Sequence, residues 1–225
     1  MNLGSFYRLA GIVGVLMLAL AAWGLARVGP DATVPIHWDA AGNPNGYGPA
    51  WAGFLLVPAI TLGLVALFAA IPRIEPRRAN LERSGSAYRT TVVAVLVLML
   101  GVHAVVVLAG VGIAVPVAPI IGGGVGLLFA VLGNVMATVR SNFLVGVRTP
   151  WTLSSELAWD RTHRLVGRMF VVGGIGMFLA SLLGNTLVLA ALIVAFMGAV
   201  LVVSLVYSYR VWRDDPDRHP IGGAS

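Results

Sequence analysis

The stretch Val92–Val115, VVAVLVLMLGVHAVVVLAGVGIAV, runs for 24 residues without a charged side chain. A helix rises about 1.5 Å per residue, so about 20 such residues cross the roughly 30 Å hydrocarbon core of a bilayer. The rest of the chain has the same character: 58% of its 225 residues are hydrophobic, 11% are charged, and the mean hydropathy is +0.90. These values exclude a soluble globular domain and indicate a multi-spanning membrane protein.

Five further uncharged runs of 15 to 22 residues predict an all-α integral membrane bundle of six transmembrane helices. The six expected spans are Leu9–Ala26, Trp51–Ile71, Val92–Val115, Ala118–Val139, Met169–Leu183 and Thr186–Tyr207. The fifth run is the shortest, and we expect its helix to begin near Leu165 because Arg168 can extend its side chain to the interface. The first run exceeds the apolar part of a typical signal peptide, so we interpret it as a retained anchor.

The arginines predict the orientation, because basic residues resist translocation across the bilayer. Fourteen of the fifteen lie in the N-terminal segment, the second and fourth connections or the C-terminal tail, and Arg27 alone lies on the other side. Both termini are therefore expected in the cytoplasm. We expect one membrane domain, 1–225, in which 1–89 form an N-terminal two-helix unit with the extracytoplasmic loop 28–50, and 90–225 form a four-helix unit with the cytoplasmic loop 140–168.

Composition also restricts the chemistry. The chain has neither cysteine nor lysine, which excludes disulfides, thiol catalysis and a lysine Schiff base. The six apolar cores contain no charged residue, which disfavours an ion-coupled transporter. The net charge of +6 comes from arginines beside apolar segments, so we expect no direct nucleic-acid binding. His103 and Asn134 are the strongly polar core residues, and at about 21 and 24 Å below the same turn they are expected to share a hydrogen bond.

The outer loop contains His37, Trp38 and Asp39, followed by Asn43 and Tyr47, among many Pro, Gly and Asn residues. Such residues fix turns, so the loop is expected to be a shaped surface rather than a linker. Its five named side chains would then contact an external ligand. The alternative is an interfacial cap in which the two aromatic side chains lie at headgroup depth.

The cytoplasmic loop 140–168 is expected to lead into the fifth span. Pro150 moves Thr149 out of helical backbone space, and Thr152 or Ser154 is expected to cap a helix that begins near Ser155. On this helix Glu156, Asp160 and His163 share one face, at i, i+4 and i+7, which is compatible with a single metal ion.

A second interpretation of the same helix needs no metal. Asp160 with Arg164 is an ordinary i,i+4 ion pair, and Trp151 and Trp159 are expected to anchor at the interface. Arg148 has no partner close in sequence, so we expect it to reach carboxylates or carbonyls of this cluster, with Glu156 the favoured partner and Asp160 the reserve.

Several motifs together resemble a known family. They are Gly133-Asn134, Arg140-Ser141-Asn142-Phe143, Gly146, Arg148-Thr149-Pro150-Trp151-Thr152-Leu153-Ser154, Trp159, Thr162-His163-Arg164 and Gly167. This pattern resembles the SdpI family of bacterial immunity membrane proteins. The earlier motifs Pro35-Ile36-His37-Trp38, Gly42-Asn43-Pro44 and Gly46-Tyr47-Gly48 are similar to the extracytoplasmic element often joined to that family's pattern.

The resemblance implies a multi-pass protein of the bacterial cell membrane that protects its cell against a secreted toxic peptide. It also implies that a transcriptional repressor could be captured at the membrane, as a form of signalling. We expect no enzyme, catalytic residue, cofactor or bound metal. The alternatives are a small-molecule transporter, or a membrane-embedded enzyme that uses the face of Glu156, Asp160 and His163.

The candidate functional residues fall into two groups. The inner group comprises Asn134, Arg140, Asn142, Arg148, Thr149, Pro150, Trp151, Glu156, Trp159, Asp160, His163 and Arg164. The outer group comprises His37, Trp38, Asp39, Asn43 and Tyr47. We expect the outer group to meet the toxic peptide, and the inner group to form a rigid element under the bundle.

Overall fold

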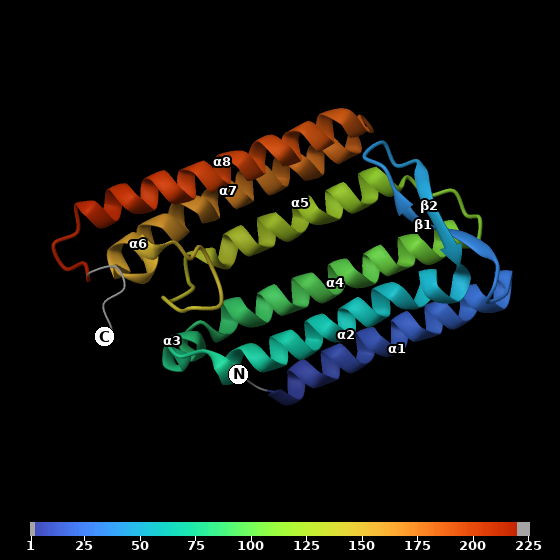
Figure 1. The fold of residues 1–225 in the computed structure, drawn as a ribbon, viewed down its shortest axis with the longest axis horizontal. Coiled ribbons are helices and arrows are strands. Elements are labelled where there is room, and N and C mark those ends of the chain that lie inside the picture. The colour runs from blue at the N-terminus through green and yellow to red at the C-terminus, as the bar shows by residue number, and fades with distance from the viewer. Residues whose placement is uncertain (1–2, 220–225) are drawn as a thin grey trace.

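The computed structural model describes residues 3–219, which form six long helices with a small hairpin at one end (Figure 1). The long helices are α1 (Leu3–Val28), α2 (Ala50–Ile74), α4 (Gly85–Gly110), α5 (Val117–Met136), α7 (Glu156–Leu182) and α8 (Thr186–Arg213). Each of them is long and apolar enough to cross a membrane. The all-α class and the six expected spans are therefore confirmed.

The long helices run side by side, so the bundle has two distinct ends (Figure 1). One end carries the strands β1 (Thr33–Trp38) and β2 (Pro44–Pro49), and we call it the outer end. The opposite end carries the short helices α3 (Arg78–Arg83) and α6 (Pro150–Leu153), and we call it the inner end. Helix α1 begins and helix α8 ends at the inner end (Figure 1).

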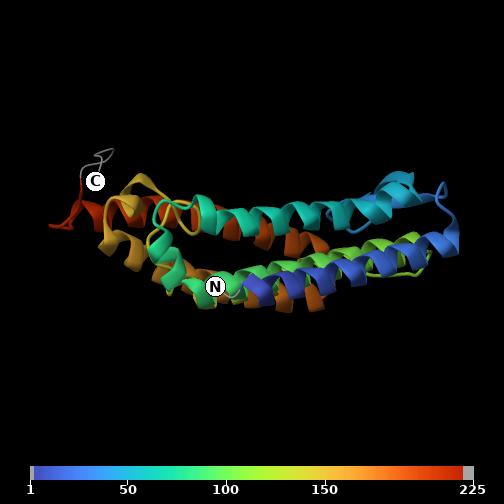
Figure 2. The same cartoon turned by 90° about the horizontal axis from the view of Figure 1, so that it is seen from below.

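Helices α1, α2 and α4 pack around one apolar core. Met17, Phe54, Leu96 and Val107 are among its fully buried members. Figure 2 shows α2 in one layer, with α1 and α4 together in the other. Helix α4 also packs against α5, which joins this group to α7 and α8.

Glycine determines the packing of α5 on α7. A Cβ atom built on Gly126 would lie 2.7 Å from the carbonyl oxygen of Gly174, and one built on Gly133 would lie 2.5 Å from that of Gly167. No side chain fits in such a space, so the two helix backbones touch. This is the close packing by small residues that membrane helices favour.

The helix ends differ from the expected ones where tertiary contacts decide them. Helix α4 begins at Gly85 rather than at Val92, and Tyr88 in its first turns is buried and donates its hydroxyl hydrogen to the carbonyl of Phe68 at 2.6 Å. The same helix ends at Gly110, because Gly112 has a φ of +83°.

Helix α7 is one continuous helix of 27 residues, so the inner polar helix does lead into the fifth span as expected. Its N-cap is Ser155, whose hydroxyl accepts the amide of Ala158 at 2.9 Å, and the expectation of Thr152 or Ser154 as its cap is wrong. Thr152 instead forms a capping box with Thr149 at the start of α6.

The outer loop is a two-stranded antiparallel hairpin rather than a series of turns. Strand β1 pairs with β2, with Val34 opposite Gly48 and Trp38 opposite Pro44. Val34 is 1% exposed and packs on the α1–α2–α4 core, which fastens the hairpin to the bundle.

The arginine distribution predicts that the hairpin faces outward and the inner end faces the cytoplasm. We expect an impermeant thiol reagent to label Ala41→Cys, but not Glu82→Cys, in intact cells. The chain has no cysteine of its own, and both positions are exposed, whereas nearby Ser84 is only 3% exposed and unsuitable.

Both cysteines should be labelled after permeabilisation, which serves as the control for their accessibility. Labelling at position 82 with none at position 41 in intact cells would reverse the orientation.

Candidate functional site

The inner loop, residues 140–155, is hydrogen-bonded to the connection between α2 and α4. Glu75, the C-cap of α2, is 4% exposed and accepts the amide hydrogens of Phe143 and Arg77, each at 3.0 Å. Asn80 of α3 donates to the carbonyl of Ser141 at 2.9 Å. Because these groups are paired with one another, the loop can lie against the bundle without leaving them unsatisfied.

Arg77 connects the inner loop to the start of α7. Its guanidinium donates to the Ser141 hydroxyl and to the carbonyl of Leu153, both at 3.2 Å, and lies 4.8 Å from the centre of the Phe143 ring. It also lies 3.9 Å from Glu156, whose carboxylate accepts a hydrogen bond from Ser141. The Glu156 side chain is 72% exposed, so this ion pair adds little by itself, and the hydrogen bonds fix the geometry.

Asn142 shapes the turn inside the loop. Its side-chain oxygen accepts the amides of Leu144 and Val145, at 3.0 and 2.6 Å. Its side-chain nitrogen donates to the carbonyls of Arg140 and Val145, both at 2.9 Å. Asn142 is completely buried, so these bonds replace those that water would otherwise make.

Trp159 and His163 of α7 form the buried surface against which the inner loop packs. Their rings stack with centroids 4.0 Å apart, and both side chains are buried. The indole nitrogen of Trp159 donates to the carbonyl of Val139 at 2.7 Å. His163 accepts the Val147 amide at Nε2, at 3.0 Å, and therefore carries its hydrogen on Nδ1, which lies 2.9 Å from the Trp159 carbonyl. The expectation that Trp159 anchors at the membrane interface is wrong.

The face of Glu156, Asp160 and His163 does not converge on one point. Both ring nitrogens of His163 are occupied, and Glu156 is turned toward Ser141 and Arg77. Asp160 pairs with Arg164 at 3.9 Å, as expected. Within residues 3–219, no group of three His, Asp or Glu side chains could hold a metal ion.

Arg148 does reach a carbonyl of the inner cluster, as expected, but the favoured partner Glu156 is wrong. Arg148 is exposed and donates to the carbonyl of Phe143 at 2.7 Å, whereas Glu156 is already bonded to Ser141. A carbonyl of the same cluster thus replaces the favoured carboxylate. The neighbouring Trp151 packs edge-on against Tyr209 of α8, with ring centroids 5.3 Å apart.

The expected hydrogen bond between His103 and Asn134 is also wrong. His103 is fully buried, and its Nε2 lies 2.9 Å from the carbonyl oxygen of Met17 in α1. Asn134 is exposed on α5. The two residues lie at similar depth on neighbouring helices, but they face in different directions, and depth alone could not reveal that.

The residues that fasten the inner loop were not found from the sequence. They are Glu75, Arg77, Asn80 and Ser84 in the α2–α4 connection, Ser208 in α8, and Asp215 after it. Asp215 is 4% exposed and accepts the Ser155 hydroxyl. A signal was present, since Glu75 and Glu82 are the two acids in an arginine-rich connection, and a buried acid there requires partners.

The second candidate site lies at the outer end, where the hairpin covers a recess of about 560 Å³. His37, Trp38, Asp39 and Ala40 line its rim. Most of the remaining lining is apolar and comes from α4, α5 and α8, including Val105, Val106, Ile121, Leu189 and Ile193. The arrangement is typical of a site for an apolar group that enters under a polar rim.

Asp39 gives this rim its shape. Its carboxylate accepts the amides of Asn43 and Ala41, both at 2.9 Å, and Gly42 between them has a φ of +87°. The hydrogen bond from the Asn43 amide holds the pKa of Asp39 below its usual value. His37 is hydrogen-bonded to Asn45, and Tyr47 is 59% exposed.

Comparison with known proteins bears on both sites. Residues 138–208 match the model of the SdpI/YfhL protein family. Over these residues the chain is similar to that family, and we call 138–208 the SdpI-family unit. Residues 12–62, which include the hairpin, match a domain of unknown function, DUF1648. The resemblance drawn from the motifs is therefore confirmed, and the chain is a multi-pass protein of the bacterial membrane.

One curated relative covers part of the chain. Over 94 residues it is 35% identical to the Immunity protein SdpI of Bacillus subtilis (strain 168). The match covers 42% of this chain and 45% of that protein, so it spans about half of the relative's length. No solved structure matches the chain.

Gly146 gives a direct test of the inner loop in the SdpI-family unit. We expect Gly146→Ala to lower the thermal unfolding midpoint of the purified protein in detergent, measured by tryptophan fluorescence. Gly146 has a φ of +116°, and a Cβ atom there would lie 2.4 Å from His163 Nε2. Such backbone strain costs about 1–3 kcal/mol.

Gly176→Ala, in α7, is the matched control, because a Cβ atom there meets nothing within 4 Å. Its unfolding midpoint should stay the same or rise. Equal midpoints for the two variants would contradict the packing of the loop on His163.

Proposed function

We propose that the chain is a non-enzymatic immunity protein, which protects its cell against a secreted toxic peptide that it meets at the outer hairpin. The observation that carries the proposal is the recess of about 560 Å³ beneath His37, Trp38, Asp39 and Ala40. The similarity to the Immunity protein SdpI supports the same role.

The geometry of the recess suits a peptide with both polar and apolar side chains. A peptide approaching from outside meets the hairpin first, where His37 and Asp39 offer polar contacts and Trp38 offers a large apolar surface. Beyond them lie the valine, isoleucine and leucine side chains of α4, α5 and α8. An apolar segment of the peptide is captured there rather than in the surrounding lipid, and the peptide is kept from inserting on its own.

The two alternatives have less support. Asp39, at the rim, is the only charged residue that lines the recess within residues 3–219, and the six cores supply no group that binds and releases an ion. An enzyme at the inner end would need Glu156, Asp160 and His163 to act together, and their side chains are held apart by other partners. Capture of a repressor at the inner end stays a prediction from the family resemblance.

A toxin challenge tests the proposal. Cells of the source bacterium that lack this gene should grow poorly in medium conditioned by wild-type cells, and the intact gene should restore growth. We expect Trp38→Ala to restore it much less, because a large aromatic anchor in a recess typically contributes more than 1 kcal/mol to binding.

Trp51→Ala is the matched control, since Trp51 lies at the same end, is 52% exposed and does not line the recess. Membrane levels of the variants should be compared by immunoblotting. Full protection by Trp38→Ala would show that Trp38 of the hairpin is not needed for protection. Unimpaired growth of the deletion strain would reject the immunity role.

A further inference from the structure

A basic recess lies between α5 and α7 near the inner end, apart from the loop and from the outer hairpin. Its volume is about 410 Å³. The lining residues are Gly133, Asn134 and Ala137 of α5, and Arg164, Gly167, Arg168, Val171 and Val172 of α7. From Arg164 to Val172 the helix rises about 12 Å, and over that distance the lining changes from arginine to valine.

The backbone contact between the helices brings the polar groups of this recess together. Gly133 and Gly167 touch, and each is followed by a polar residue, Asn134 on α5 and Arg168 on α7. A larger residue at either glycine would separate the helices. The amide and the guanidinium are therefore held at one place on the side of the bundle.

These polar groups lack acceptors. In residues 3–219, the structure gives no hydrogen bond or ion pair for the side chains of Asn134 and Arg168. Arg164 lies 3.9 Å from Asp160, with both side chains more than a third exposed, so its charge is only weakly compensated. Donors at the edge of the hydrocarbon layer are costly unless an acceptor meets them.

We infer that this recess binds one anionic phospholipid. The headgroup phosphate accepts hydrogen bonds from Arg168, Arg164 and Asn134, and an acyl chain lies along Val171 and Val172. The apolar part of the recess argues for a lipid rather than a free phosphate ion, because Val172 is 73% exposed on a helix that is long and apolar enough to cross a membrane. This inference does not depend on the immunity role.

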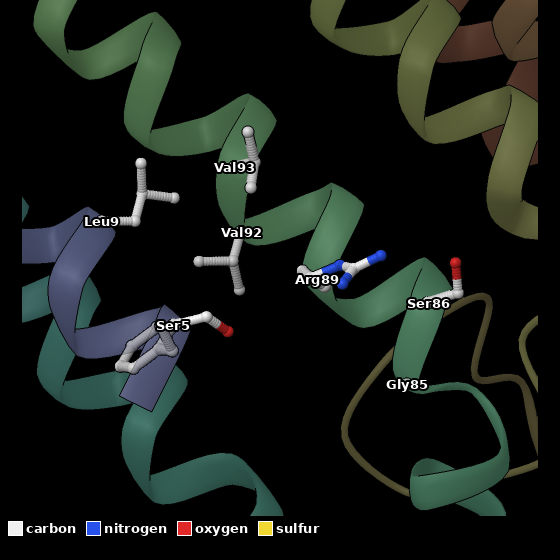
Figure 3. A pocket seen from close by; sticks show the side chains of 8 residues that line it. Ser5, Leu9, Gly85, Ser86, Arg89, Val92 and Val93 are labelled. Carbon is white, nitrogen blue, oxygen red and sulfur yellow. The ribbon is translucent and has the colours of Figure 1, made fainter. Parts of the chain in front are cut away.

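A second recess near the inner end provides a matched control. It has a volume of about 470 Å³ and lies between α1 and α4, where Leu9, Val92 and Val93 supply apolar walls. Arg89 is its one arginine, and Figure 3 shows that side chain pointing away from Leu9 and Ser5. It therefore has a similar size but one arginine, where the first recess has two.

Native mass spectrometry of the full chain in neutral detergent tests the inference. Dioleoyl-phosphatidylglycerol should bind more tightly than dioleoyl-phosphatidylcholine. We expect Arg168→Gln to weaken phosphatidylglycerol binding about fivefold, the effect typical of one basic residue near an anionic headgroup. Asn134→Leu and Arg164→Gln should each weaken it, Arg168→Lys should weaken it less, and Arg89→Gln should leave it unchanged.

Three results would overturn the inference. The first is equal binding of the two lipids, and the second is an equal loss in Arg89→Gln and Arg168→Gln, which would reflect net charge alone. The third is displacement of the lipid by excess inorganic phosphate, which would make a free anion the ligand. Circular dichroism of each variant checks that its helices are intact. If Arg168→Gln loses helix content, the phosphatidylglycerol affinity of Arg164→Gln tests the inference instead, because Arg164 is exposed.

Discussion

The contact between the backbones of α5 and α7 is the constraint on which much of the molecule depends. Four glycines allow it, in two pairs, Gly126 with Gly174 and Gly133 with Gly167. Because the helices cannot slide or rotate without a collision, the start of α7 is fixed relative to the end of α5. That placement lets Trp159 reach the carbonyl of Val139, and the inner loop can then fold back over the Trp159–His163 stack.

The inner loop also shows how the two matched regions of the chain are joined. The matches cover residues 12–62 and 138–208, but Glu75, Arg77 and Asn80 lie between them and fasten the loop from outside both. Each of these side chains satisfies groups that would otherwise be buried without partners. The connection between α2 and α4 thus holds the inner loop of the SdpI-family unit from outside the matched residues.

Apolar run length is a local property, and the six spans could be predicted from it. Two of the errors have a common cause, which is that the rotation of a helix about its axis depends on its neighbours. Trp159 was expected at the interface and is buried, while His103 faces α1 rather than Asn134. The favoured partner of Arg148 was wrong for a different reason, which is that Glu156 already accepts a hydrogen bond from Ser141. The hairpin was anticipated only as a shaped loop, since its glycine and proline content hid the strand pattern.

Helix α8 connects the two ends of the molecule. It runs unbroken from Thr186 to Arg213, about 42 Å at the usual rise, with no proline in its interior. Its first turns line the outer recess, and Ser208 near its other end accepts a hydrogen bond from Thr149 at the base of the inner loop. One uninterrupted helix therefore contributes both to the outer recess and to the Thr149 contact at the inner end, so the two places share a structural element although they lie at opposite ends of the bundle.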